Sequence, residues 1–341
     1  MARRTVSVRR SVADIYKVTS RSRLASAAAL LLSAVAAACS PSQASAAPKG
    51  DPFVGQHLYV DPHSQAAQAA DDMRQANPHD ADELDKIANH SQADWFGDWN
   101  SVSSVQQTVA DRRRAIHRAG DLPVFVVYDI PLRDCGGYSG GGATSPASYR
   151  SWVRNFTAGV GRGVAAVVLE PDALASMDCL TPDQQSTRLA LLRYAVRTLT
   201  AHPKTSVYID AGHSGWHPAS VMAARLLQAD VADARGFSLN VSNFDATRVE
   251  RDYGHDVSAA VGRKPFVIDT SRNGLGSNGE WCNPSGRALG HRPSARTHDS
   301  SVDAYLWIKR PGESDGTCNG GPPAGQWWTD YAVGLAERAS Y

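Results

Sequence analysis

The sequence lacks the charge patterns that are typical of proteins that bind nucleic acids or anionic membranes. It contains 35 basic and 34 acidic residues, for a net charge of +1 at pH 7. The first 46 residues hold seven of the basic residues and one acidic residue, which leaves 28 basic and 33 acidic residues and a net charge of −5 beyond them. No long run of either charge occurs in that remainder. We therefore expect neither nucleic acid nor a membrane as a partner.

Long apolar runs are also absent, apart from one near the start of the chain. Residues 24–38 form a run of fifteen mostly small residues, which is too short for a comfortable membrane span. A basic segment precedes this run and Ala44-Ser45-Ala46 follows it, as in a signal peptide. We expect residues 1–46 to be a signal peptide and residues 47–341 to be the secreted, extracellular protein. Lipid attachment at Cys39 is an alternative that the sequence leaves open.

Cysteine is scarce and its spacing does not suggest a metal site. The chain has five cysteines, and none of the four beyond residue 46 stand as C-x-x-C. An even number of cysteines in an exported chain favours disulfides over a metal site, although four cysteines allow three connectivities. Their order favours two local pairs, each closing a loop of roughly 40 residues and worth about 4 kcal/mol. The pairs are Cys135–Cys179 and Cys282–Cys318.

Residues 47–341 contain no Pro/Ser/Thr-rich linker, internal repeat or low-complexity tail, so we expect one domain. Apolar segments that suit strands alternate there with helical patterns. Such alternation predicts an α/β fold whose parallel sheet has right-handed crossovers, and six or seven units predict a closed or nearly closed barrel. The predicted strands are 94–97, 123–128, 167–170, 206–209, 236–239, 265–268 and 304–309, and the predicted helices are 64–89, 105–119, 147–161, 183–201, 218–229, 247–261 and 327–339.

One of these strands ends in two carboxylates. Val167-Val168-Leu169 is followed by Glu170-Pro171-Asp172, and Pro171 ends the strand because it cannot donate to a ladder. A carboxyl group at that edge, close to apolar walls, can keep its proton near neutral pH, as a general acid must. The alternative is that Glu170 and Asp172 cap the following helix.

Polar and aromatic residues follow almost every predicted strand. In barrels of parallel strands the active site lies at the carboxyl ends of the strands, so these residues predict a catalytic rim. They are Tyr128, Arg133, Asp134, Glu170, Asp172, Asp210, His213, Trp216, Asn240, Asp269, Arg272, Lys309, Glu313 and Asp315.

The residue types of this rim favour glycoside hydrolysis. Paired carboxylates can protonate a leaving oxygen and activate water, while indole faces stack on sugar rings. A metal site would need a tighter set of His and Asp ligands, so we expect no metal and no cofactor. A serine hydrolase would need G-x-S-x-G, which Gly212-His213-Ser214-Gly215 does not match.

Six motifs in order, from about Tyr59 to the end of the chain, resemble glycoside hydrolase family 6, the family of inverting cellulases. They are Tyr128-Asp129-Ile130-Pro131-x-Arg133-Asp134-Cys135, Leu169-Glu170-Pro171-Asp172, Asp210-Ala211-Gly212-His213-Ser214-Gly215-Trp216, Asp269-Thr270-Ser271-Arg272-Asn273-Gly274, Glu280-Trp281-Cys282 and Trp307-Ile308-Lys309-x-Pro311-Gly312-Glu313-x-Asp315-Gly316.

The resemblance implies a distorted, partly open parallel (β/α) barrel of about seven strands and an inverting attack on β-1,4-glucan. Asp172 would be the general acid, and Asp134 would raise the pKa of that acid and organise water. Asp315 occupies the position of the proposed base, although water could relay the proton to a more distant carboxylate. The two disulfide pairs favoured above are also those of the family. Residues expected to bind substrate are Trp95, Tyr128, Arg133, Asp210, His213, Trp216, Asn240, Trp281, Lys309 and Glu313.

The mode of attack is predicted from loop length. Family members that attack chain ends roof the cleft with long loops, whereas residues 272–281 and 282–318 are short. We expect a monomeric endo-β-1,4-glucanase that acts on cello-oligosaccharides and amorphous cellulose. A cellobiohydrolase and a non-catalytic glucan-binding protein are the alternatives. Glu170 is expected to orient its neighbours, and Asp269 and Arg272 either face substrate or pair with each other.

Overall fold

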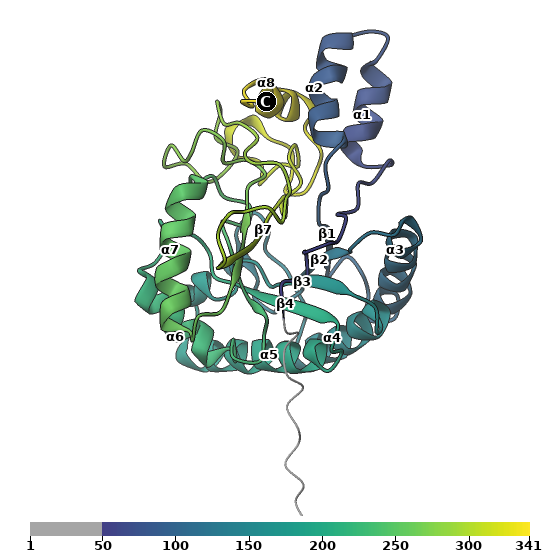
Figure 1. The fold of residues 1–341 in the computed structure, drawn as a ribbon. Coiled ribbons are helices and arrows are strands. Elements are labelled where there is room, and N and C mark those ends of the chain that lie inside the picture. Colours follow the sequence, from purple (N-terminus) through teal and green to yellow (C-terminus); the bar gives the residue numbers. More distant parts are fainter. Residues whose placement is uncertain (1–49) are drawn as a thin grey trace, which may run out of the picture. The chain divides into compact units, whose positions relative to one another are not determined.

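Seven short strands form one parallel sheet in the order in which they occur along the chain (Figure 1). The computed structural model describes residues 50–341, so the predicted signal peptide at residues 1–46 and Cys39 lie outside the described residues. No ladder of the described strands joins the first strand to the last, which confirms the predicted partly open parallel barrel. The strands are β1 (Asp94–Gly97), β2 (Val124–Tyr128), β3 (Ala165–Leu169), β4 (Thr205–Asp210), β5 (Gly236–Leu239), β6 (Phe266–Asp269) and β7 (Val302–Leu306).

The strands are apolar on both faces because each face packs against a different part of the core. In β2, Val124 and Val126 belong to the cluster inside the barrel, whereas Phe125 and Val127 pack with the surrounding helices. In the register of the sheet Val126 is opposite Val168 of β3, which also faces inward. Side chains alternate along a strand, so this pattern carries every second residue of β2 and β3 into the barrel.

Helices cover the outer face of the sheet, where α3 to α7 follow one another around it (Figure 1). The helix predicted at 64–89 is two helices, because Asn77 caps the second one and Pro78 occupies its first turn. No helix of residues 50–341 has the length and apolarity to cross a membrane. The helices are α1 (Gln65–Met73), α2 (Pro78–Ala88), α3 (Val105–Ala119), α4 (Pro146–Val160), α5 (Pro182–Thr200), α6 (Ala219–Gln228), α7 (Thr247–Ala260) and α8 (Thr329–Glu337).

Two disulfides tie the long loops that follow the strands. Cys135 is bonded to Cys179 and Cys282 is bonded to Cys318, which is the pairing that the sequence favoured. The first disulfide joins the loop after β2 to the loop after β3. These two loops carry Asp134 and Asp172, and we refer to residues 129–142 as the β2 loop and to residues 170–180 as the β3 loop.

Candidate active site

The carboxyl ends of the strands open into a cleft of about 1030 Å³. Nearly all of the predicted site residues line it, although they are spread over more than 200 positions of the sequence. A parallel sheet brings them together because all of its strands end at the same edge. The predicted residues that line the cleft are Trp95, Tyr128, Arg133, Asp134, Asp172, His213, Trp216, Trp281, Lys309, Glu313 and Asp315.

Asp172 lies on the cleft wall and does not cap a helix. The next long helix, α5, is capped by Thr181, whose side chain accepts a hydrogen bond from the backbone N–H of Gln184. Burial raises the pKa of the Asp172 carboxyl to about 8, and the charges of Asp210 and Asp134 add to this effect. A carboxyl group with this pKa is protonated at neutral pH and can donate its proton.

Asp210, which we predicted to contact substrate, lies beneath the cleft and not on its wall. It is 1% exposed, and its Oδ1 accepts hydrogen bonds from the backbone N–H of Asp172 at 2.9 Å and of Gly212 at 3.0 Å. Its Oδ2 accepts a hydrogen bond from Ser238 Oγ at 3.0 Å. Asp210 therefore positions the backbone of the candidate acid and acts on it by charge.

Asn240 is a second correction, because it is fully buried and has no access to a substrate. Its Nδ2 donates to the carbonyl oxygens of Asp269 at 2.9 Å and Asp245 at 3.2 Å, and its Oδ1 accepts from the Asp245 N–H at 3.1 Å. An amide side chain at the end of a strand can form hydrogen bonds with a substrate or with the backbone. In Asn240 both the nitrogen and the oxygen of the amide are hydrogen-bonded to the backbone.

The β2 loop holds Asp134 against its own backbone. Asp134 Oδ2 accepts a hydrogen bond from the Ser139 N–H at 2.7 Å, and a Cβ at position 137 would approach the same oxygen to 2.7 Å. Gly137 therefore gives the carboxylate its space. Arg133 donates through Nη1 to the carbonyl oxygen of Tyr128 at 2.6 Å and through Nε to that of Ser139 at 2.8 Å. Arg133 thus shapes the loop as well as lining the cleft.

Asp315 is held by two cations. Arg272, fully buried, donates through Nη1 to Asp315 Oδ2 at 2.8 Å, and Lys309 Nζ lies 3.6 Å from Oδ1. The N–H of Asn283 also donates to Oδ2, at 3.0 Å. Burial lowers the pKa of Lys309, and the charge of Asp315 opposes this effect. Oδ1 is the oxygen of Asp315 that keeps most room for a further partner.

The proposed pairing of Asp269 with Arg272 is wrong. Arg272 is paired with Asp315, whereas Asp269 accepts backbone N–H groups from Lys309 at 2.8 Å, Ser271 at 2.9 Å and Ser242 at 3.1 Å. The Asp269 carboxylate therefore joins the loops that follow β5, β6 and β7 by hydrogen bonds. Asp269 thus has several backbone donors in place of the arginine partner that was one of the two alternatives.

The strand ends carry backbone strain. In the β2 and β3 loops the φ angles are 59° at Leu132, 53° at Asp134, 53° at Glu170 and 67° at Asp172. Residues other than glycine adopt such angles only where the surrounding structure imposes them, often at functional sites. The backbone conformations of Asp134 and Asp172 are therefore unfavourable by themselves and are imposed by the surrounding structure.

Glu170 supports this arrangement from below, as expected for an orienting residue. It is fully buried, and its carboxylate accepts hydrogen bonds from the backbone N–H groups of Asp129 at 3.1 Å and Ile130 at 3.0 Å. Burial raises the pKa of Glu170 to about 7. It connects the β3 loop to the start of the β2 loop and does not reach the cleft.

Aromatic side chains form the exposed walls of the cleft. Trp281 is 56% exposed, Trp216 is 39% exposed, and Tyr138 and Trp99 are 50% and 57% exposed. Tyr138 and Trp281 lie next to each other, with 6.0 Å between ring centroids. Trp95, by contrast, is only partly exposed because its Nε1 donates to the Ile308 carbonyl at 2.8 Å.

Tyr138 and Trp99 are cleft residues that the sequence analysis missed. Both follow strands, Trp99 two residues after β1 and Tyr138 in the glycine-rich β2 loop. Their positions after strand ends could have identified them. Their side-chain directions could not be inferred, because irregular loops have no fixed periodicity.

His213 is held at the cleft by an ion-pair partner. Its Nδ1 lies 2.7 Å from Asp245 Oδ2. Burial disfavours the charged imidazole, but the hydrogen bond and charge of Asp245 raise the pKa of His213 above its ordinary value. His213 also lies beside Trp216, with 5.7 Å between ring centroids, so the two form one corner of the cleft.

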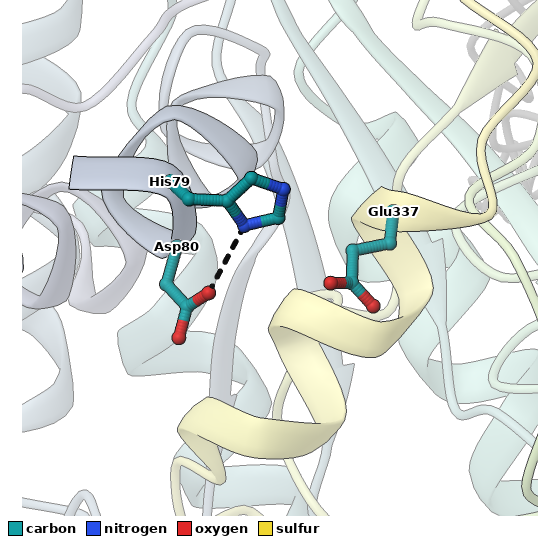
Figure 2. A group of neighbouring side chains, drawn as sticks. All are labelled: His79, Asp80 and Glu337. Atoms are coloured by element: carbon teal, nitrogen blue, oxygen red, sulfur yellow. Dashed lines mark hydrogen bonds and ion pairs between the residues drawn. The ribbon is translucent and has the colours of Figure 1, made fainter. Parts of the chain in front are cut away.

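One group of three potential metal ligands occurs in residues 50–341, and it lies on helices and not at the strand ends. Figure 2 shows His79 and Asp80 of α2 beside Glu337 of α8. His79 and Glu337 are exposed, and Asp80 is engaged by Asn77 at the start of α2. Exposed groups of this kind are common without an ion, so we assign no metal to it.

Asp210→Asn should move the alkaline limb of the pH–activity profile, where activity is lost as pH rises, to lower pH by about one pH unit. The substitution removes a neighbouring negative charge that favours the protonated form of Asp172. Asparagine keeps a side-chain oxygen that can accept the N–H of Asp172. The protonated form of Asp172 is the active one, so its lower pKa causes the loss of activity at a lower pH. The measurement is kcat/KM against pH, with the exposed Asp183→Asn as control; an unchanged limb would contradict the coupling.

Comparisons with known proteins identify the family of this chain. The family model described as "Glycosyl hydrolases family 6" matches residues 53–339. Endoglucanase A of Cellulomonas fimi is 48% identical over 285 residues, which are 83% of this chain and 62% of that protein. Endoglucanase 1 of Streptomyces halstedii is 42% identical over 291 residues, which are 81% of this chain and 87% of that protein. The chain thus spans less than two thirds of the Cellulomonas protein.

Solved structures share the fold. An endoglucanase of Mycobacterium tuberculosis in complex with methyl-cellobiosyl-4-deoxy-4-thio-β-D-cellobioside is 49% identical, with a TM-score of 0.81, and the match covers 84% of this chain and 99% of that one. The catalytic core domain of a cellobiohydrolase from Chaetomium thermophilum is 26% identical, with a TM-score of 0.74, and the match covers 85% of this chain and 99% of that one.

Proposed function

Because the chain belongs to glycosyl hydrolases family 6, we propose that it is an endo-β-1,4-glucanase that hydrolyses internal bonds of cellulose-type glucans with inversion. The observation that carries the proposal is the position of the Asp172 carboxyl, whose pKa burial raises to about 8, on the wall of a cleft lined with exposed aromatic rings. Acid catalysis at the glycosidic oxygen needs the first feature, and binding of successive sugar rings needs the second.

Asp172 donates its proton to the glycosidic oxygen as the bond to the anomeric carbon breaks. Water attacks the opposite face of that carbon, and its proton passes to a carboxylate or to further water. The negative charges of Asp134 and Asp210 favour the protonated form of Asp172 before the reaction. After proton transfer the cations that line the cleft, among them Lys309 and Arg133, lie among the carboxylates and reduce their mutual repulsion.

Asp315 and Asp134 are the two candidates for organising the attacking water. Asp315 has one oxygen that accepts from Arg272 and Asn283, which leaves Oδ1 toward Lys309 as the candidate acceptor. Asp134 has Oδ2 engaged by Ser139, which leaves its other oxygen. We assign Asp315 the role of base and Asp134 that of raising the pKa of the acid and ordering the water.

Substrate binding is proposed to use the ring faces and the polar groups of the cleft. Trp216, Trp281 and Trp99 are 39–57% exposed although they line the cleft, which supports an open groove that a glucan chain can enter sideways. Tyr128, packed edge-on against Trp95 at 5.2 Å, would press on the sugar at the cleavage point. Lys309 and Glu313 line the same cleft, are nearly buried and would bind hydroxyl groups of the sugar.

Attack on internal bonds is tested on carboxymethylcellulose by comparing the fall in viscosity of the solution with the number of reducing ends released. An enzyme that cuts internal bonds lowers viscosity steeply before many reducing ends appear. A cellobiohydrolase would release reducing ends while viscosity falls slowly. A binding protein without activity would bind cello-oligosaccharides and release none, and either of the last two results would overturn the proposal.

Hydrolysis of a cello-oligosaccharide should first yield the α-anomer at the new reducing end. Inversion is expected because one displacement by water turns the β-linkage into an α-hydroxyl. Proton NMR of fresh product follows the two anomeric signals before mutarotation equilibrates them. Initial appearance of the β-anomer would mean a two-step retaining mechanism and would exclude water as the first nucleophile.

We also propose that the protein is extracellular and acts as a monomer. Two disulfides support an oxidising compartment, since such bonds are rare in reduced cytosol. The proposed acid, the proposed base and the exposed tryptophans of the cleft are all supplied by residues 99–315 of this chain, which supports a monomer whose cleft is complete. Fractionation of the producing cells tests the first point, and light scattering during gel filtration tests the second.

A further inference from the structure

Arg188 is a charged residue on the buried face of α5, and the proposed reaction does not use it directly. It lies on the same buried face as Leu191, Leu192 and Ala195 and is 2% exposed. Arginine is almost never buried to this extent unless it is paired, because an unpaired buried charge is strongly unfavourable. Both Nη groups of Arg188 have partners, whereas its Nε has none among the described residues. The partners of Arg188 therefore indicate what it does.

Those partners come from both loops that carry the catalytic aspartates. In the β2 loop, Nη2 of Arg188 donates to the carbonyl oxygen of Pro131 at 2.9 Å and to that of Leu132 at 2.7 Å. In the β3 loop, Nη1 donates to the carbonyl oxygen of Ala173 at 3.2 Å and to Ser176 Oγ at 3.3 Å. A single guanidinium thus bridges two loops that follow neighbouring strands.

The bridged atoms lie close in sequence to the two carboxylates. Leu132 precedes Asp134 by two positions, and Ala173 follows Asp172 directly. Ser176 also donates to the carbonyl oxygen of Asp172 at 2.8 Å, so a chain of two hydrogen bonds joins the guanidinium to the acid's own backbone. A displacement of Arg188 would therefore move both carboxylates relative to each other.

The strained residues of these loops lie at or within a few positions of the same contacts. Leu132 and Asp134 in one loop, and Glu170 and Asp172 in the other, have φ angles between 53° and 67°. Strained backbone persists only where neighbouring groups hold it, and four hydrogen bonds from one buried side chain meet that need. The disulfide between the same loops joins them at Cys135 and Cys179, not at the carbonyl groups that Arg188 engages.

We propose that Arg188 is a positioning residue that joins the β2 loop to the β3 loop and thereby holds Asp134 and Asp172 at their working separation. The inference rests on the proposed function and specifies how its two carboxylates are kept together. The disulfide Cys135–Cys179 joins the same loops at a second point.

Arginine suits this position better than lysine. Its planar guanidinium presents several N–H groups in a fixed fork, whereas an ammonium is a point donor that cannot reach both loops in the same way. The charged and titratable groups that face Arg188 are Glu170 of the β3 loop and Tyr149 of α4. Burial lowers the pKa of Arg188, and the charge of Glu170 opposes that effect, so the guanidinium stays charged.

The test compares Arg188→Met with Arg197→Met, an arginine on the same helix whose exposed side chain pairs with Asp230 at 2.6 Å. On a soluble cello-oligosaccharide, kcat of Arg188→Met should fall by about tenfold or more while KM changes little, because misplaced catalytic groups affect the transition state. The alkaline limb should move to lower pH, since Asp172 and Asp134 no longer repel each other at close range. Arg197→Met should match the wild type in all three properties.

Arg188→Lys separates charge from geometry and remains informative if Arg188→Met does not fold. Lysine keeps the positive charge but can engage only one of the two loops, so kcat should fall and the limb should move in the same direction by less. Full activity in Arg188→Lys would show that charge alone suffices and would overturn the proposal. Unchanged kcat and alkaline limb in folded Arg188→Met would overturn it as well.

A readout without turnover distinguishes this inference from the proposed function. The carboxyl ¹³C shift of Asp172, assigned by its loss in Asp172→Asn, reports the titration of that side chain in wild type and in Arg188→Met. If the protein releases no sugar but Arg188→Met lowers the pH at which Asp172 titrates, the positioning role of Arg188 is supported and the proposed function is overturned. If the titration is the same in both proteins, the bridge is refuted, whatever the activity.

Discussion

Asp172→Asn should lose nearly all activity on carboxymethylcellulose, with kcat lower by about 10²–10⁴-fold, which is the usual contribution of a general acid. Asparagine has almost the same shape as aspartate but no acidic proton to transfer, so KM should change little. Reducing-sugar release from purified wild type and variant measures the effect. Retention of most of the rate by the variant would show that another group protonates the leaving oxygen.

An activated substrate provides the matched control for this variant. A dinitrophenyl cellotrioside has a leaving group that departs without a proton, so Asp172→Asn should keep much more of its rate on this substrate. An equal loss on both substrates would point to damage elsewhere in the cleft. Asp183→Asn, at an exposed position of α5, should behave as wild type on both.

The stability of the same variant tests the state of the proton. Asp172 has an ordinary pKa of 3.8 in the unfolded chain and about 8 when folded, because burial disfavours its ionised form. Between these values the folded state binds more protons, so this residue makes the wild type less stable as pH rises. Asp172→Asn removes that dependence, and its free energy of unfolding should fall less between pH 5 and 8, as denaturant titrations at several pH values would measure.

Arg272→Met should lower the free energy of unfolding by about 3–5 kcal/mol, because it leaves a buried carboxylate without its main counter-charge. Arg272 is fully buried, donates to Asp315 at 2.8 Å, and lies over the ring of Phe244 at 4.3 Å. Methionine fills part of the volume but cannot donate to Asp315 or to the Ser242 carbonyl, which Arg272 also engages. Urea denaturation followed by tryptophan fluorescence measures the loss.

A surface pair and a double variant serve as controls for Arg272. Arg248 lies 3.4 Å from Asp252 with its side chain 80% exposed, so Arg248→Met should change stability by less than about 1 kcal/mol. Arg272→Met combined with Asp315→Asn should lose less than the sum of the single losses, because the neutral amide needs no counter-charge. Additive losses would mean that the two side chains do not depend on each other.

Sequence periodicity predicted a parallel barrel, and the resemblance to the family predicted that this barrel is distorted and partly open. Strands of apolar, mostly β-branched residues and helices with one apolar face are local patterns, and their alternation allows few arrangements other than a parallel barrel. The helix predicted at 64–89 was divided by Asn77 and Pro78, whose turn chemistry outweighs a continuous alanine-rich pattern. The last strand ends at Leu306, so Trp307 to Lys309 belong to the loop that reaches the cleft.

The sequence by itself placed Asp172 directly after an apolar strand, because strand ends are local patterns. It also favoured the two local cysteine pairs over the other connectivities, whereas the proximity of Asp172 to Asp134 was implied by the resemblance to the family. The tertiary structure alone decided that Asp210 and Asn240 serve the backbone, that Arg272 pairs with Asp315, and that Arg188 bridges two loops. A polar side chain in a loop has several partners within reach, and its choice among them depends on which backbone groups the folded chain leaves unpaired. That depends on contacts between distant segments, which no local pattern records.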